Sequence, residues 1–299
     1  MKNIAVKVNY KYNTTEDVYS DGDVEDELLQ IVRECDDYDE IVARTNKFSI
    51  FYHLSKEREC IVAPMNIGHD DVVLEIGAGC GAITGALAGC AAKVDCIELS
   101  PRRALINAYK NYTCDNVEIF VGNYQDVALT KEYDVITLIG VFEYAGQYFH
   151  TCSPYEDFLL DVLDKLKKNG RLYIAIENRL GGKYFSGCVE DHAGVMYEGI
   201  NGYPKYTNAK TFSYYEWIEL LAKCGVENYR FMYPYPDYKF PRQIFSDTFL
   251  PDKETFNMAS SNYIGKRANV FQENAFFKSL VLKHEFKIFA NSYLICITK

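Results

Sequence analysis

Three glycines and an acidic residue stand where the chain can hold a small ligand. Residues 72–76 form an apolar run that leads into the turn Gly77-Ala78-Gly79-Cys80-Gly81, and a second apolar run ends at Glu98. Glycines allow a tight turn and let a ligand approach the peptide groups closely. A carboxylate about 20 residues further on can accept both hydroxyl protons of a ribose. Together the two signals predict a nucleoside-containing ligand at the carboxyl ends of two strands.

A nicotinamide dinucleotide is the main rival for this ligand. Its enzymes share the glycine turn, but their fingerprint places the third glycine one position later, where this chain has Ala82 followed by Ile83. Glu75, just before the turn, would repel a pyrophosphate and would suit a ligand with an ammonium group. S-adenosylmethionine carries an ammonium and a sulfonium and no phosphate, so these residues favour it over a dinucleotide.

With these residues the chain resembles the class I S-adenosylmethionine-dependent methyltransferases over roughly residues 68–180. The resemblance implies that residues 75–81 contact the methionine part of the cofactor and that Glu98 holds the ribose. It implies a contact to the adenine from Gly122-Asn123, where the family usually has Gly-Asp, and Asp126 lies three residues on. The backbone of residues 138–144 would line the methyl-transfer site. The implied cofactor-binding residues are Glu75, Gly77, Ala78, Gly79, Gly81, Glu98, Leu99, Asn123, Tyr124 and Gly140.

A second likeness covers short blocks of the second half of the chain, at residues 175–185, 190–192 and 235–241. These blocks are similar to methyltransferases found with glycosyltransferases of bacterial surface-polysaccharide biosynthesis. The likeness implies a hydroxyl acceptor on a small molecule or glycan.

Transfer to a hydroxyl needs a base within hydrogen-bond reach. His192 is the first candidate, because the neighbouring acids Glu190 and Asp191 can orient it and raise its basicity. A surface histidine in a turn is an equally good interpretation of the same residue. His150 is the alternative base, and Glu143 is the third catalytic candidate.

A metal site is the other use for these acidic residues. Glu143 and Glu177 are expected at the rim of the ligand site, where either can bind the acceptor or a metal. Residues 190–192 are themselves a possible metal cluster, but three adjacent ligands from one turn are an uncommon geometry. We therefore expect no metal requirement.

The elements that must position these residues follow a strand–turn–helix rhythm from residue 72 onward. Alternating apolar strands and helices are typical of a largely parallel sheet with helices on both faces. We predict a doubly wound, mostly parallel seven-stranded α/β sheet, a Rossmann-like methyltransferase fold. The predicted strands are 72–76, 94–98, 117–121, 133–139, 171–177, 229–233 and 292–298. The predicted helices are 82–88, 102–109, 155–166 and 213–224. Residues 167–170, Lys-Lys-Asn-Gly, read as the stop of the third helix.

An acidic and mostly helical extension, residues 1–66, is predicted to precede the methyltransferase domain, residues 67–299. It starts with a short alternating strand and continues with helices over 24–34 and 38–65. Between residues 15 and 40 there are twelve acidic residues and one basic residue. We interpret this block as a solvated helix face with flanking loops.

Two long irregular stretches, at about 178–210 and 237–285, are predicted to be cap insertions after the fifth and sixth strands. They are longer than simple connections, and loops of that length are usually functional. Their many tyrosines can contact a sugar or pack the caps themselves. We expect most of them to pack.

Composition limits the partners. The net charge is −10 and no Lys/Arg-rich stripe occurs, which argues against a nucleic-acid partner. No apolar run reaches the ~18–20 residues of a membrane helix, and no secretion signal is evident. Ten cysteines are scattered without a Cys-x-x-Cys pair, which is typical of a reducing compartment and predicts a cytoplasmic protein. The oligomeric state stays open.

The sequence thus predicts a methyltransferase that uses S-adenosylmethionine for O-methylation of a small-molecule or glycan hydroxyl. Two alternatives from other classes stay open. The first is aminopropyl transfer, for which Asp191 and Asp237 would form the acidic site of a polyamine. The second is a non-catalytic module that binds the cofactor. A nicotinamide-dependent oxidoreductase is favoured less.

Overall fold

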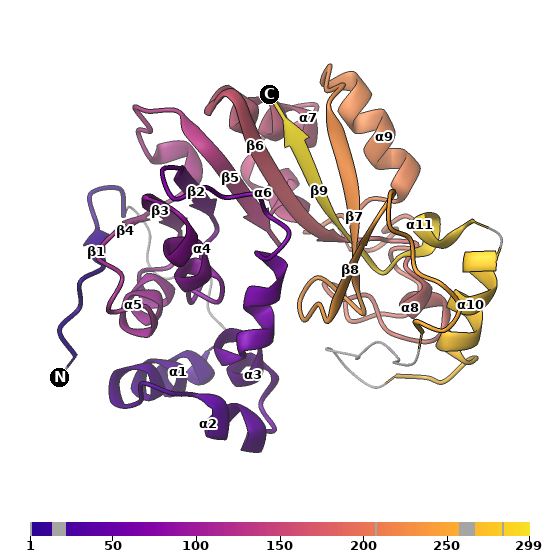
Figure 1. Cartoon of the computed structure of the whole chain (residues 1–299), viewed down its shortest axis with the longest axis horizontal. Helices are drawn as coiled ribbons and strands as arrows, with labels where there is room; N and C mark the ends of the chain where they lie inside the picture. The colour runs from indigo at the N-terminus through magenta and orange to yellow at the C-terminus, as the bar shows by residue number, and fades with distance from the viewer. Residues whose placement is uncertain (1, 14–21, 207, 257–266, 283) are drawn as a thin grey trace. The chain divides into compact units, whose positions relative to one another are not determined.

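The computed structural model describes residues 2–13, 22–206, 208–256, 267–282 and 284–299 (Figure 1). The chain divides into two compact units. The first comprises Met1–Leu138 and Lys165–Arg171, and the second comprises Ile139–Asp164 and Leu172–Lys299. This division does not coincide with the expected boundary at residue 66, which stays a prediction.

The first unit contains five parallel strands. They lie in the order β1-β4-β3-β2-β5, and the four pairs of neighbouring strands are all parallel. Strand β2 is a nearly continuous apolar run with four of its five residues buried, as in a strand covered on both faces, whereas burial alternates along β4. Their bounds are β1 Lys7–Asn9, β2 Val72–Ile76, β3 Lys93–Glu98, β4 Val117–Val121 and β5 Tyr133–Ile139. The predicted bounds of β2, β4 and β5 are confirmed, and the N-terminal strand lies later than residues 1–7.

The helices of the first unit include α4 Thr84–Cys90 and α5 Pro101–Lys110. Ser100 caps α5, its hydroxyl accepting from the Arg103 N–H at 3.2 Å, and Pro101 suits the first helical position. A short 3₁₀ turn, η2, follows β4 at Tyr124–Asp126. These elements start directly after β2, β3 and β4, so the turns between them hold the predicted cofactor residues.

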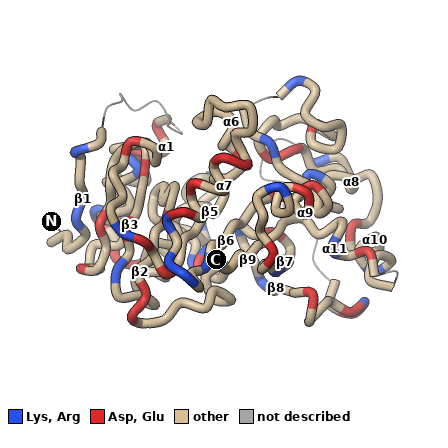
Figure 2. The backbone as a smooth tube through the Cα atoms, turned by 90° about the horizontal axis from the view of Figure 1, so that it is seen from above, with Lys and Arg blue, Asp and Glu red and all other residues tan. Residues whose placement is uncertain are grey.

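The N-terminal region is helical but more broken than predicted. Helix α1 spans Asp23–Glu34, and Figure 2 marks its acidic residues in red. The single helix expected over 38–65 is wrong: the chain forms α2 Asp39–Arg44, α3 Phe48–Leu54 and the 3₁₀ helix η1 Lys56–Ile61. Residues 45–47 and 55 interrupt it, because Thr45 and Ser55 hydrogen-bond the backbone two residues on. Residues 14–21 of the acidic block lie outside the described residues.

Helix α1 packs on α5 through a shared core of Leu28, Val32 and Ile106, all fully buried. Beside this core, Arg103 Nε donates to Glu25 Oε1 at 2.7 Å, and both side chains are buried. Breaking one partner of such a buried pair is strongly destabilising. The N-terminal helices are therefore an integral part of the first unit.

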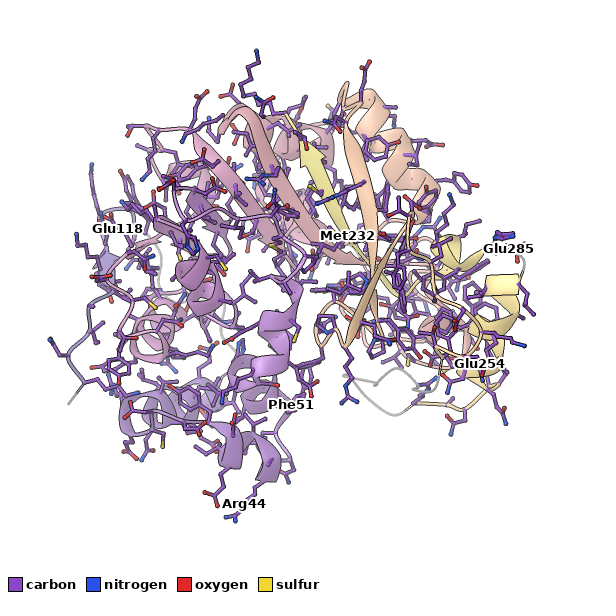
Figure 3. All side chains as sticks on the ribbon, viewed as in Figure 1. Arg44, Phe51, Glu118, Met232, Glu254 and Glu285 are labelled. Atoms are coloured by element: carbon purple, nitrogen blue, oxygen red, sulfur yellow. The ribbon has the colours of Figure 1, made fainter. Side chains whose placement is uncertain are left out.

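The second unit contains the strands on the C-terminal side, in the order β6-β9-β7-β8. β7 is antiparallel to both β8 and β9. The buried Met232 of β7, labelled in Figure 3, stands opposite Ser246 of β8 and Leu294 of β9. The bounds are β6 Leu166–Glu177, β7 Tyr229–Tyr235, β8 Gln243–Ser246 and β9 Ser292–Thr298. The expected seven-stranded, mostly parallel sheet is thus wrong in detail: nine strands are described, and their arrangement is mixed. Of the two strands beyond the expected seven, β1 corresponds to the short strand expected in the N-terminal extension, and β8 was not predicted.

The helices of the second unit lie before β6, between β6 and β7, and between β8 and β9 in the chain. Their bounds are η3 Phe142–Tyr144, α6 Ala145–Tyr148, α7 Pro154–Asp164, α8 Gly182–Phe185, α9 Tyr214–Lys223, α10 Glu273–Leu282 and α11 Phe286–Phe289. The predicted helix stop at residues 167–170 is wrong, because α7 ends at Asp164 and these residues belong to β6. The predicted cap at Ser213 is confirmed as a capping box with Glu216.

Most of the described aromatic residues between residues 184 and 245 are buried, as expected. Trp217 is fully buried against Phe142 and Phe212, with ring centroids 5.0 and 5.4 Å away. Tyr233 and Tyr235 are buried as well, whereas Tyr215 is exposed. Residues 257–266 of the second predicted cap lie outside the described residues. None of the described helices is both long and apolar enough to cross a membrane, and all ten cysteines are free.

Candidate functional site

The glycine turn of the first unit presents open backbone. Gly77, Gly79 and Gly81 all have left-handed φ angles, of 73°, 54° and 78°. The amides of Gly77 and Ala78 both donate to the carbonyl of Ile97 on β3, at 2.9 and 3.1 Å. A Cβ placed at Gly79 would meet no heavy atom within 4 Å. The turn is therefore fixed by β3 and leaves free space beside Gly79, where a ligand can contact the peptide.

Gly81 serves a different purpose from Gly79. A Cβ at Gly81 would lie 2.3 Å from Asn107 Oδ1 and 2.6 Å from Asn111 Nδ2. Lys110 Nζ donates to the carbonyl of Gly81 at 2.9 Å, and burial lowers the pKa of this ammonium. Asn107 and Lys110 of α5 and the C-cap residue Asn111 thus hold the end of the turn from the protein side. The third glycine is required by packing, not by room for a ligand.

Glu98 ends β3 with its carboxylate directed at the turn. Its Oε2 accepts from the Gly79 N–H at 2.7 Å, and its Oε1 accepts from the Ser100 N–H at 2.8 Å. Burial raises the pKa of Glu98, against the opposing effect of these backbone hydrogen bonds and of the Arg103 charge. Each carboxylate oxygen can accept a second hydrogen bond. The predicted contact to ribose hydroxyls is compatible with this geometry and stays a prediction.

Glu75 is held inside the first unit. Its Oε2 accepts from the Thr84 hydroxyl at 2.7 Å and from the Cys96 thiol at 3.4 Å. Asn107 in turn donates to the Thr84 hydroxyl at 3.0 Å. Burial raises the pKa of Glu75 to about 7. We expected this carboxylate to point at a ligand. In the structure, one of its two oxygens links β2 to β3 and α4 through these hydrogen bonds.

The remaining predicted cofactor residues surround the ends of β3, β4 and β5. Asn123 is half-buried, and its amide donates to Gln125 Oε1 at 3.0 Å. Tyr124 is buried, Leu99 is half-buried and Asp126 is exposed. The roles expected for these residues stay predictions.

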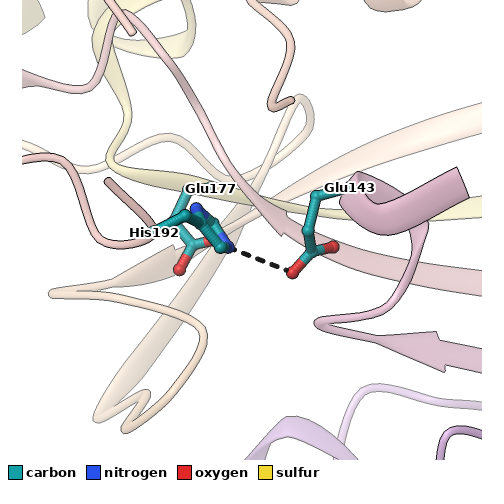
Figure 4. A group of neighbouring side chains, drawn as sticks. All are labelled: Glu143, Glu177 and His192. Atoms are coloured by element: carbon teal, nitrogen blue, oxygen red, sulfur yellow. Dashed lines mark hydrogen bonds and ion pairs between the residues drawn. The ribbon is translucent and has the colours of Figure 1, made fainter. Parts of the chain in front are cut away.

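Three ionisable side chains meet in the second unit, and their residues lie far apart in the sequence (Figure 4). Glu143 lies in the turn η3 after β5, Glu177 is the last residue of β6, and His192 lies in the irregular stretch that follows. His192 Nε2 is 3.4 Å from Glu143 Oε1 and 4.0 Å from Glu177 Oε2. All three side chains are at most 7% exposed. We call them the Glu-Glu-His cluster.

The cluster contains carboxylate oxygens without a protein partner. Glu143 Oε2 and Glu177 Oε2 are buried and accept no hydrogen bond from any described residue. Buried carboxylate oxygens are normally satisfied, and each exception calls for an explanation. The Glu-Glu-His cluster is therefore shaped to receive a donor or a cation.

Glu190 fixes the orientation of His192. Its Oε1 lies 3.0 Å from His192 Nδ1, and its Oε2 accepts from the backbone amides of His192 and Ala193 at 2.8 and 2.6 Å. Burial alone would lower the pKa of His192, but the hydrogen bonds to Glu143 and Glu190 outweigh it and raise the pKa well above its ordinary value. Nε2 is thus aimed at Glu143 and Glu177.

Two buried lysines, which the sequence analysis did not single out, complete this charged region. Lys239 Nζ pairs with Glu177 Oε1 and lies 3.7 Å from Asp191 Oδ2. Lys183 Nζ pairs with Asp191 Oδ2 at 2.6 Å and with Asp237 Oδ2. Lys183 and Lys239 lie in the sequence blocks 175–185 and 235–241, whose likeness to polysaccharide-associated methyltransferases was a signal that could have pointed to them. The pairing occupies Asp191 and Asp237, so the geometry does not favour them as a polyamine site.

Gly140 lies beside the Glu-Glu-His cluster, with Glu143 Oε1 3.7 Å from where its Cβ would be, whereas His150 lies apart from the cluster. Gly140 has a φ of 71°, donates its N–H to the carbonyl of Ala175 at 2.9 Å, and has the Tyr238 hydroxyl 2.8 Å from where a Cβ would be. His150 is exposed after α6 and is not part of the Glu-Glu-His cluster. Of the three catalytic candidates, the structure brings His192 and Glu143 together and leaves His150 apart.

Residues 74–172 match the family model of a methyltransferase domain. The match spans β2 to the middle of β6, and so it includes the glycine turn, Glu98 and Glu143. It supports the expected enzyme class and leaves the acceptor undefined. No curated protein gives a significant match to the sequence.

Solved structures with similar folds are methyltransferases or proteins assigned as such. Phosphoethanolamine N-methyltransferase 1 of Haemonchus contortus, in complex with phosphoethanolamine and S-adenosylhomocysteine, is 12% identical with a TM-score of 0.52. The match covers 95% of this chain and 51% of that one, so the chain spans about half the length of the nematode enzyme.

Two other structures are also similar to this chain. One is a Haloferax volcanii protein assigned as a methyltransferase, in complex with the Trm112 methyltransferase activator: 18% identity, TM-score 0.48, 89% of this chain and 96% of that one. The other is an O-methyltransferase family 2 protein of Planctomyces limnophilus in complex with apigenin: 12% identity, TM-score 0.46, 91% and 65%. None of these comparisons shows the expected likeness to polysaccharide-associated methyltransferases.

Proposed function

We propose that the chain is an S-adenosylmethionine-dependent O-methyltransferase whose acceptor is a hydroxyl of a small molecule or glycan. The match of residues 74–172 to a methyltransferase domain supports the reaction class. The open space at Gly79 and the carboxylate of Glu98 fit an adenosyl ligand, because the first admits a group against the peptide and the second can accept ribose hydroxyls. When bound, S-adenosylmethionine supplies a methyl carbon activated by its sulfonium, which leaves as the neutral thioether.

The observation that carries the O-methylation proposal is the Glu-Glu-His cluster. A hydroxyl acceptor must lose a proton as its oxygen gains the methyl group. Both ring nitrogens of His192 already face carboxylates, at 3.0 and 3.4 Å, so the ring has no free position for another proton. Glu143 Oε2 is buried and free of protein donors among the described residues. We therefore assign Glu143 as the base, in place of His192.

The other residues of the region hold Glu143 and His192 in place. Glu190 orients the imidazole through Nδ1, and the ring of Tyr144 meets the imidazole edge-on at 5.6 Å. The backbone of Glu143 is fixed separately, since its carbonyl accepts from the Lys210 N–H at 2.9 Å. A rigidly held base has the geometry that proton transfer requires.

The proposal is tested by methyl transfer from S-adenosylmethionine tritiated in the methyl group to a panel of monosaccharides, glycans and other hydroxyl compounds. The Glu143→Gln variant should lower kcat by about 10² to 10⁴-fold, the usual range for loss of a general base. Calorimetric Kd values for S-adenosylmethionine should stay unchanged, because its predicted contacts belong to the first unit apart from Gly140, which Glu143→Gln leaves in place. Glu219→Gln, an exposed residue of the same unit, is the matched control.

Two results would contradict the proposal at different levels. Wild-type turnover by Glu143→Gln would refute the assigned base and leave the methyltransferase intact. Failure of the wild-type chain to bind S-adenosylmethionine or S-adenosylhomocysteine would refute the methyltransferase itself, and binding of a dinucleotide would favour the oxidoreductase alternative.

A further inference from the structure

The Glu-Glu-His cluster has the donor set of a metal site. His192 Nε2, Glu143 Oε1 and Glu177 Oε2 lie within 4.8 Å of one another. Ligands that bind one ion at about 2.1 Å lie about 3 to 4 Å apart, and the two measured separations from Nε2 are 3.4 and 4.0 Å. One imidazole nitrogen with two carboxylates is a common ligand set for divalent first-row metals.

The unpartnered oxygens point to the same use. Glu177 Oε1 is engaged by Lys239, whereas Glu177 Oε2 has no partner among the described residues and faces His192 Nε2. A carboxylate buried completely and left half-satisfied costs free energy unless a cation or donor completes it. The Lys239 ion pair fixes the carboxylate so that its free oxygen stays directed at the cluster.

The Nδ1 atom of His192 has the kind of partner that is usual in metal-bound histidines. A metal-bound histidine usually donates the N–H of its other ring nitrogen to an acceptor such as a carboxylate, which fixes the tautomer and the ring orientation. Glu190 Oε1 takes this position at Nδ1, 3.0 Å away, and Glu190 is itself held by the amides of His192 and Ala193. A divalent ion that displaces the Nε2 proton would therefore meet Nε2 and the two carboxylates as its ligands.

The charge balance of the buried region also calls for a cation. Five carboxylates and two ammonium groups are linked by contacts of 4.0 Å or less, directly or through His192. Their formal charges sum to −3 with a neutral imidazole and to −2 with a protonated imidazole whose two N–H groups both face carboxylates. A divalent ion that displaces the Nε2 proton would bring the sum to −1. The acidic members are Glu143, Glu177, Glu190, Asp191 and Asp237, and the basic members are Lys183 and Lys239.

We propose that Glu143, Glu177 and His192 bind one divalent metal ion of the Mn²⁺ or Zn²⁺ type, with Glu190 as the residue that positions His192. Three protein ligands leave coordination positions open. In its catalytic role, which rests on the proposed function, the ion binds the acceptor oxygen and makes its hydroxyl more acidic. Glu143 then binds through Oε1 and receives the proton on Oε2. This proposal replaces the expectation that the chain needs no metal.

The test uses the full chain, freed of metal with EDTA and desalted, and Mn²⁺ as the probe. Binding is followed by loss of the electron paramagnetic resonance signal of hydrated Mn²⁺, with Zn²⁺ as competitor. One Mn²⁺ per chain should bind, and Zn²⁺ should displace it. Glu143→Gln and His192→Gln should each weaken binding by at least about tenfold. His69→Gln, which removes an exposed histidine of the first unit, should bind as the wild type does.

Folding and cofactor binding are measured on the same samples. Both variants should keep the wild-type far-ultraviolet circular dichroism and Kd for S-adenosylmethionine. Absence of saturable Mn²⁺ binding, or equal binding by wild type and both variants, would overturn the proposal. If a variant binds Mn²⁺ weakly because it has lost its fold, Glu190→Gln is tested in its place. This variant should weaken Mn²⁺ binding without removing a metal ligand.

The metal proposal and the proposed function can fail separately. If Mn²⁺ binds at this site but no hydroxyl compound is methylated, the site stands and O-methylation falls. If methylation proceeds at the same rate in EDTA-treated chain with and without added Mn²⁺, while Mn²⁺ binds, the catalytic role of the ion is refuted. The expected result is at least a tenfold rise in rate on adding Mn²⁺.

Discussion

The glycine turn of the first unit and the Glu-Glu-His cluster of the second unit present opposite kinds of binding surface. At the turn, consecutive residues after one strand present backbone, and the open position at Gly79 comes from a missing side chain. In the cluster, three side chains from separate segments converge, and two of their oxygens have no hydrogen-bond partner in the described part of the chain. A binding site made of contiguous backbone can be predicted from a motif, whereas one made of converging side chains depends on the fold.

The largest expected effect separates the two regions directly. Gly79→Arg places a long side chain in the open space beside the turn, and it should weaken S-adenosylmethionine binding by about 1000-fold or more, because a side chain excludes a ligand from the backbone. Gly225→Arg is the control, since Gly225 also has a left-handed φ, of 69°, and open space around its Cβ position. Calorimetry should show wild-type affinity for Gly225→Arg. If Gly79→Arg binds S-adenosylmethionine with wild-type affinity, the turn is not part of the cofactor site.

The next effect tests whether two glycines of one turn differ as their surroundings indicate. Gly81→Ala should lower the free energy of unfolding by about 3 kcal/mol, combining left-handed strain with overlap against Asn107 and Asn111. Asn107 is buried and hydrogen-bonded to Thr84, so it cannot move aside freely. Gly79→Ala carries only the strain and should cost about 1 kcal/mol. Urea denaturation measures both, and equal losses would show that packing at Gly81 does not matter.

The sequence predicted the first region well for a physical reason. Buried strands read as apolar or alternating runs, so β2, β4 and β5 were placed with their correct bounds, and the turn after β2 followed from its glycines. The motif did not reveal that Asn107 on α5 and Asn111 at its C-cap leave no room for a side chain at position 81. Such a contact depends on how α5 packs, not on local sequence.

The sequence named the members of the second region without predicting their arrangement. His192, Glu143 and Glu177 were each candidates, but adjacency in sequence suggested Glu190 and Asp191 as the neighbours of His192 that matter. In the structure Glu190 does contact the imidazole, whereas Asp191 pairs with Lys183. Residues 143, 177 and 192 are joined only when β5, β6 and the following stretch fold, and no periodicity encodes that.

The smallest expected effect concerns the buried carboxylate beneath the turn. Burial raises the pKa of Glu75 to about 7, against 4.5 for an ordinary glutamate. Protonated Glu75 is therefore favoured in the folded state, so its contribution to stability is complete below pH 4.5 and is lost as the pH rises through 7. Relative to Glu75→Gln, the wild type should lose about 2 kcal/mol of unfolding free energy between pH 5 and pH 7.5.

Urea denaturation of the wild type and Glu75→Gln at each pH gives this difference, because the other titrating groups are shared and cancel. A constant difference across the range would mean that Glu75 titrates normally, and then its carboxylate would be open to solvent or to a ligand's ammonium. A saturating concentration of S-adenosylmethionine should shrink the pH dependence if the ammonium contacts Glu75, since a nearby cation stabilises the charged carboxylate. An unchanged pH dependence with ligand bound would restrict Glu75 to fastening β2 to β3 and α4.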